Sequence, residues 1–138
     1  MTDTEHRIIR FIRADVEILE DDSCKATVEL ERQGAGIFTA TARGPSSRDD
    51  QIRAVARATS DALSEAFDVN RVRVRVMSAQ MVQPLTRIAV LVTLAVTRGA
   101  DSETLLGICD ATDNLARAAA LSVLNATNRY LGRLPEAG

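Results

Sequence analysis

The side chains able to do chemistry in this 138-residue chain are few and far apart. The single histidine, His6, has no carboxylate, cysteine or serine near it at a recognisable catalytic spacing. Cys24 and Cys109 are the only cysteines and lie in widely separated segments, so we expect both to be reduced packing residues. No Cys or His stands at metal-ligand spacing. We therefore expect no enzymatic activity, no metal and no cofactor.

The carboxylates lie at positions where acidic side chains commonly have structural roles. Asp49 and Asp50 fall at a predicted helix start, where acids favour the positive end of the helix dipole. Glu29 and Glu31 alternate along a predicted strand. Helix caps and solvated faces are therefore favoured over acid-base work or Mg²⁺ binding.

Arginine alternates with valine from residue 71 to 76, which places Arg71, Arg73 and Arg75 on one face of a predicted strand. Such a face could contact phosphates, so a nucleic-acid-binding module is the alternative function. The net charge of -2 and the low aromatic content of 3% make nucleic acid an unlikely partner. The competing interpretation is that these arginines pair with acids of neighbouring strands, such as Asp15, Glu17, Glu29 or Glu31.

The segment that contains Gly44, Pro45 and Ser46 leads a predicted strand into a helix. Free backbone N–H groups at a helix N-terminus can hold a carboxylate or a phosphate. A purely structural alternative is a Gly-Pro stop followed by a helix cap at Ser46 or Ser47. The local sequence leaves both interpretations open.

The elements that must position these residues form an internal repeat. The two halves align at an offset of 64 residues, which places Val28 on Val92 and Leu30 on Leu94. The first half predicts a helix after three strands at 8–19, 25–31 and 37–42. The second half predicts strands at 71–82, 88–97 and 104–109, and a helix from Thr112 or Asp113 to Gly132.

The predicted fold is α+β, with duplicated β-β-β-α units, antiparallel sheets and two helices packed on one face. We expect residues 1–138 to form a single domain made of two repeats, about 8–68 and 71–132.

Two segments predict an obligate or near-obligate homodimer. The second helix is apolar over about half its circumference, which is more than one sheet can cover. Residues 88–96 are apolar on both sides of a strand, whereas residues 26–31 alternate between apolar and polar. A second copy would cover the surplus. We expect the interface to contain Ala119, Val123, Ala126 and Tyr130.

The segment from residue 88 to 96 is the longest apolar stretch and is too short to cross a bilayer as a helix. The first residues lack the uninterrupted apolar core of a signal peptide. We therefore expect a cytoplasmic protein without a membrane partner.

The chain resembles a known family in three short motifs: Gly44-Pro45 before the first helix, residues 107–110 (Gly-Ile-Cys-Asp) before the second, and residues 123–129 within the second. With the duplicated units, these motifs resemble the C-terminal regulatory domain of 2-isopropylmalate synthase and citramalate synthase over nearly the whole chain. The resemblance implies a stand-alone dimeric regulatory module that binds a small metabolite or a partner enzyme. It suggests leucine or isoleucine as the first ligands to test, near Gly44, Pro45, Ser46 and Gly107.

Overall fold

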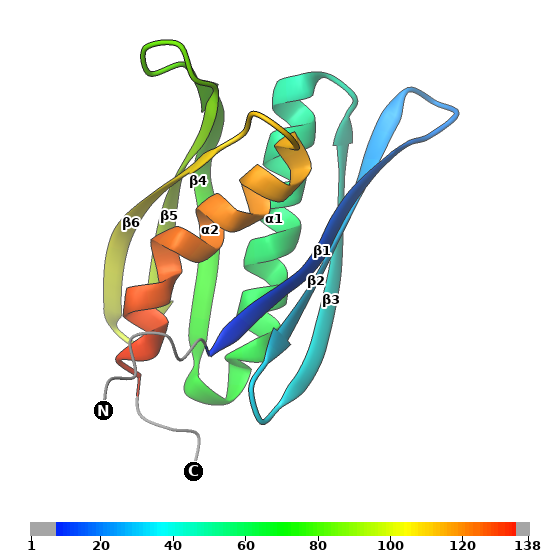
Figure 1. The fold of residues 1–138 in the computed structure, drawn as a ribbon. Coiled ribbons are helices and arrows are strands. Elements are labelled where there is room, and N and C mark those ends of the chain that lie inside the picture. The colour runs from blue at the N-terminus through cyan, green and yellow to red at the C-terminus, as the bar shows by residue number, and fades with distance from the viewer. Residues whose placement is uncertain (1–7, 135–138) are drawn as a thin grey trace.

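The computed structural model describes residues 8–134, which form two successive units of three strands and one helix (Figure 1). Unit 1 contains β1 (Ile9–Ile18), β2 (Ser23–Arg32), β3 (Gly36–Pro45) and α1 (Arg48–Ala66). A short 3-10 turn, η1 (Asp68–Asn70), leads into unit 2. Unit 2 contains β4 (Val72–Val82), β5 (Ala89–Arg98), β6 (Asp101–Asp110) and α2 (Leu115–Gly132). The predicted α+β fold with duplicated units is confirmed.

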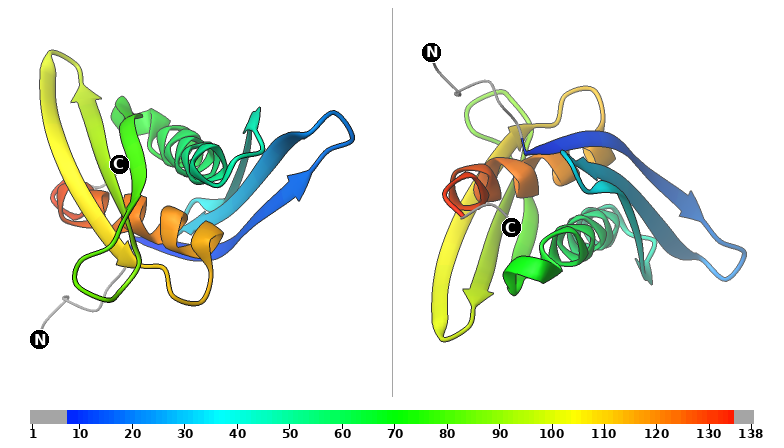
Figure 2. Two further views of the ribbon diagram at one scale, coloured as in Figure 1. Left: turned by 90° about the horizontal axis from the view of Figure 1, so that it is seen from above. Right: turned by 90° about the horizontal axis from the view of Figure 1, so that it is seen from below.

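Each unit forms its own antiparallel sheet: β1-β2-β3 make sheet A, and β4-β5-β6 make sheet B. The two helices lie between the sheets (Figures 1 and 2). Helix α1 packs on β2 and β3 and also contacts β4 of the other unit. Helix α2 packs on β5 and β6 and also contacts β1 and α1. Each sheet therefore has one face covered by helices and one outer face without cover from the described chain.

The buried core lies between the sheets, because each central strand turns its apolar side chains inward. Even-numbered residues of β2 and β5 are buried, including Val28, Leu30, Val92 and Leu94. Phe67, at the end of α1, is the largest of the fully buried side chains. The alternation that predicted β2 is therefore the alternation between core and outer face.

The two units share strand register and one irregularity. β1 carries a bulge between Phe11 and Arg13, and β4 carries a bulge between Val76 and Ser78. In β2, Val28 pairs with Ala14 and Ala40. In β5, Val92 pairs with Ala79 and Gly107. Gly107 and Ala40 thus occupy the same position, and the offset of 64 holds only for the central strands because the turns differ in length.

The element boundaries differ most from the prediction in the third strands and at the start of the second helix. Both third strands are longer than predicted, since the pairing continues to Pro45 in β3 and to Asp110 in β6. Helix α2 is capped by Asn114, whose side chain accepts the Arg117 N–H at 2.9 Å. The predicted caps at Thr112 or Asp113 were wrong, because Thr112 instead donates to the Asp110 carboxylate.

Candidate functional site

The turn before α1 is held together by its own side chains. Ser47, one of the two predicted caps, accepts the Asp50 N–H at 3.2 Å, and its hydroxyl donates to the Asp50 carboxylate at 2.7 Å. The Gln51 amide donates to the Ser46 carbonyl at 2.7 Å. Asp49 and Asp50 both lie in the first turn of the helix. A carboxylate ligand would meet these two negative charges at the positive end of the helix dipole.

Gly44 lies near the end of β3, opposite Cys24. A Cβ at Gly44 would lie 3.4 Å from a guanidinium nitrogen of Arg57, which is an ordinary contact with a flexible side chain. The same nitrogen donates to the Arg43 carbonyl at 2.6 Å. The Pro45 carbonyl accepts the Cys24 thiol at 3.3 Å. The chain's own groups therefore engage the backbone on both sides of Gly44.

Gly107 has a packing role in β6. A Cβ there would lie 2.0 Å from the Ser122 carbonyl oxygen and 2.8 Å from the Ala126 Cβ. Only glycine lets α2 approach the strand this closely. Gly107 belongs to sheet B and Gly44 to sheet A, on opposite sides of the helix pair (Figure 2). The structure does not bring the two predicted ligand-binding glycines together.

The residues predicted for the dimer interface are covered by the chain itself. Ala119 and Val123 are fully buried, Ala126 is buried, and Tyr130 is half-buried. Helix α2 contacts β6 and β5 on one side and β1 and α1 on the other. Its apolar surface is therefore larger than one sheet could cover, because elements of both units cover it. The surplus apolar surface of this helix is therefore no longer a reason to place a dimer interface on it.

The predicted arginine face is divided by the structure. Arg71 precedes β4 in a left-handed conformation with φ of 61°, so only Arg73 and Arg75 share the exposed face of the strand. Arg73 pairs with Asp68 at 3.1 Å. The acids predicted as its cross-strand partners lie in sheet A, where Glu29 and Glu31 pair with arginines of β1. That choice of partners was wrong, because β4 and β2 belong to different sheets.

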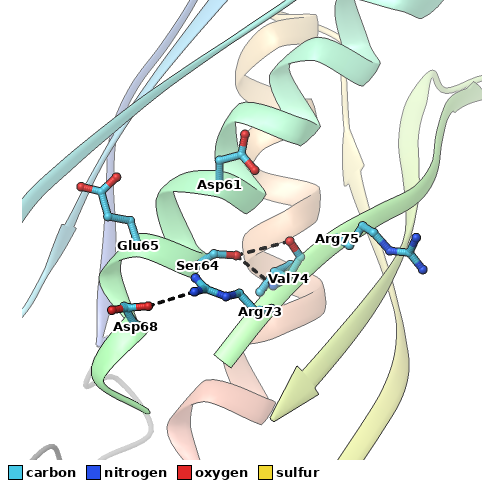
Figure 3. A pocket seen from close by; sticks show the side chains of 7 residues that line it. All are labelled: Asp61, Ser64, Glu65, Asp68, Arg73, Val74 and Arg75. Carbon is cyan, nitrogen blue, oxygen red and sulfur yellow. Dashed lines mark hydrogen bonds and ion pairs between the residues drawn. The ribbon is translucent and has the colours of Figure 1, made fainter. Parts of the chain in front are cut away.

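Arg73 and Arg75 border an open groove between α1 and β4 (Figure 3). Its helical side carries the carboxylates of Asp61, Glu65 and Asp68. At the floor of the groove the Ser64 hydroxyl accepts the Val74 N–H at 2.9 Å. Because β4 is an edge strand, this side chain provides the hydrogen bond that a further strand would otherwise make. Partial burial raises the pKa of Asp61, although Arg57 opposes the shift. With acids lining one side, this groove does not favour a polyanion.

Two further titratable groups have structural roles. Hydrogen bonds from the Thr112 hydroxyl and N–H, together with Arg87, lower the pKa of Asp110 to about 2. This carboxylate fixes the turn that leads from β6 into α2. Burial raises the pKa of the Cys109 thiol, and this half-buried side chain packs against the core, as predicted.

Large exposed hydrophobic side chains gather in unit 2, which the sequence analysis did not anticipate. Leu106 is 67% exposed on β6, Met77 is 56% exposed at the β4 bulge, and Leu85 is 96% exposed in the β4–β5 turn. Ile108 is exposed on the same face of β6 as Leu106, and Ile88 is exposed just before β5. The spacing of Leu106 and Ile108, two residues apart on a strand, is the signal that could have placed both on one outer face.

Within residues 8–134, no cluster of three or more His, Cys, Asp or Glu side chains is arranged to hold a metal ion. No helix over the same range is long and apolar enough to cross a membrane. No protein-family model matches the chain, and no curated protein matches it significantly.

Proposed function

We propose that this protein is a homodimeric, non-enzymatic module of the regulatory type. The observation that carries the proposal is the gathering of exposed hydrophobic side chains on unit 2, from Met77 and Leu85 to Leu106 and Ile108. Contiguous apolar patches on a soluble domain are typical of interaction sites. In unit 1 the exposed hydrophobic residues are Ile18 and Ile37, and they do not share a face, since Ile18 pairs with the buried Cys24 whereas Ile37 pairs with Glu31 of the outer face. Val69, also exposed, lies in η1 between the units.

The roles of the acidic groups support the non-enzymatic part of this proposal. Asp110 and Asp50 fix turns at helix starts, and Glu29 and Glu31 form ion pairs with arginines. Each of these carboxylates already has a structural partner. A general acid or base would instead need a partner positioned for the reacting group.

The ligand part of the proposal rests on the family resemblance. A branched-chain amino acid near Gly44, Pro45 and Ser46 would have to displace the contacts that Arg57 and Gln51 make there. A thermal-shift measurement with leucine or isoleucine tests this part. Saturating ligand, at a hundred times its dissociation constant, should add about 2.7 kcal/mol of stability. An unchanged melting temperature at millimolar ligand would restrict the module to protein contacts, such as those with a partner enzyme.

Sedimentation equilibrium tests the homodimer directly. The wild-type chain of 14.9 kDa should give a mass of about twice that value at micromolar concentration. Leu106→Arg should shift the protein to the monomer, because it places a charge in the apolar patch. Thr39→Arg is the matched control, since Thr39 takes the same place in unit 1 that Leu106 takes in unit 2. A wild-type monomer at every concentration would overturn the proposal.

A further inference from the structure

The outer faces of the two sheets can be compared position by position, because the units share their register. On sheet A, Arg10 pairs with Glu31 at 2.8 Å, and Arg13 pairs with Glu29 at 3.2 Å. Arg13 also pairs with Asp15 along the same strand. This outer face is therefore a ladder of ion pairs, and its middle is charged.

On sheet B most of the same positions are neutral, and Arg75 is the exception. Arg75 takes the place of Arg10, and the residue across from it is Ala95 where unit 1 has Glu31. Ser78 and Thr93 face each other where unit 1 has Arg13 and Glu29. Five further exchanges remove charge or add apolar surface: Gln80 for Asp15, Val82 for Glu17, Leu91 for Thr27, Leu106 for Thr39 and Ile108 for Thr41. The exchange of Thr104 for Ile37 goes the other way, and Asp110 for Arg43 keeps a charge.

The charges of this face stand at its margins. Arg73 and Arg75 lie at one end of β4, and Asp110 lies at the opposite end of β6, where it pairs with Arg87. The middle of the face carries no charged side chain and is partly apolar. Such a surface gives a charged partner nothing to pair with, whereas it matches a second surface of the same kind without like-charge repulsion.

Building on the proposed homodimer, we infer that two copies associate by packing the outer faces of sheet B against each other. Sheets stacked in this way lie about 10 Å apart, as in a β-sandwich. Strands of ten or eleven residues give the face a footprint of about 33 by 14 Å. This footprint of about 460 Å² per copy is below the roughly 600 Å² per copy of the smallest stable interfaces. The association is therefore reversible.

Pairing between the edges of two β6 strands is the competing arrangement, and the structure disfavours it. The Ile108 carbonyl already accepts the Asn125 amide at 3.0 Å. Glu103 follows the inward parity of the strand, because it pairs with the buried Val96. A charge that points inward on an edge strand is a device that discourages edge pairing.

Variants that give sheet B the residues of sheet A test the inference by sedimentation equilibrium. Ala95→Glu should raise the dimer dissociation constant at least tenfold, because two carboxylates would be buried in the interface. The variant should fold, since its Glu can pair with Arg75 as Glu31 pairs with Arg10. Glu31→Ala is the matched control in sheet A and should leave the dissociation constant unchanged.

Leu106→Thr provides a second, milder variant, and hydrogen exchange of the β6 amides separates the two arrangements. Face packing predicts weaker association for Leu106→Thr and no added protection of the β6 edge on dimerisation. A folded Ala95→Glu variant that dimerises like the wild type would overturn the inference and leave the homodimer standing. Slower amide exchange along β6 in the dimer would also overturn face packing and would support pairing between the β6 edges. A monomeric wild type would overturn both proposals.

Discussion

The two units of this protein have nearly the same strand pairing but different side chains at equivalent positions. Their strands pair in the same register and carry the same bulge. At equivalent positions the side chains nevertheless have different roles: Ala40 against Gly107, Arg32 against Val96, and Arg43 against Asp110. The strand register of a βββα unit is therefore compatible with very different side chains at equivalent positions, and each unit makes contacts that the other lacks.

The largest effect should come from Gly107, where unit 2 brings its helix closest to its sheet. Gly107→Ala would place a methyl group 2.0 Å from the Ser122 carbonyl oxygen, so α2 must move away. We expect a loss of about 3 kcal/mol in the free energy of unfolding, the upper end of the usual cost of overpacking. Urea denaturation measures it.

Gly44→Ala is the control for that variant. The added methyl group would make an ordinary contact of 3.4 Å with the end of Arg57, so the stability should change little. Equal losses in the two variants would show that the close approach at Gly107 is not what distinguishes unit 2.

A smaller effect is expected at Arg32, which is buried at the position that Val96 holds in unit 2. Its guanidinium donates to the Ala66 carbonyl at 2.7 Å, and it stacks over the Phe67 ring at 3.9 Å from the centroid. It therefore caps the negative end of α1.

Arg32→Leu should lower the free energy of unfolding by about 2 kcal/mol, because it leaves the Ala66 carbonyl without this charged donor. Thermal or urea denaturation measures the loss. Arg10→Leu, on the exposed face of the same sheet, should cost much less. If Arg32→Leu leaves the free energy of unfolding unchanged, arginine at this position adds no stability to unit 1.

The smallest effect concerns Asp110, which stands where unit 1 has Arg43. The pKa of Asp110 is lowered to about 2, so its folded form favours the ionised carboxylate. A lowered pKa stabilises the protein above the unfolded value near 4 and loses this contribution as the pH falls toward 2. The stability difference between wild type and Asp110→Asn should therefore be present at pH 6 and vanish near pH 2. A difference that persists at pH 2 would show that charge is not its origin.

The sequence was sufficient to predict the six strands, the two helices and the duplication, because those depend on local periodicity and turn residues. It was less informative about α2. The surplus apolar surface of residues such as Ala119 and Val123 reflects a helix between two sheets, and that arrangement depends on contacts between distant segments.

The candidate site was harder to anticipate for the same reason. Gly107 was predicted to be a ligand-binding residue, and its packing against Ser122 becomes visible only once α2 is placed. Recognising the uncharged middle of the outer face of sheet B required the register, since Ala95 is informative only when it is compared with Glu31. Composition alone shows no such contrast.

The crosswise contacts of the helices have a consequence for folding. Because α1 contacts β4 and α2 contacts β1, each unit completes its core with a strand of the other. A chain cut between the units would leave the β4-facing side of α1 exposed to water, so we expect each fragment to be much less stable than the intact chain. The duplicated chain should therefore unfold in one cooperative transition, with the two repeats melting together.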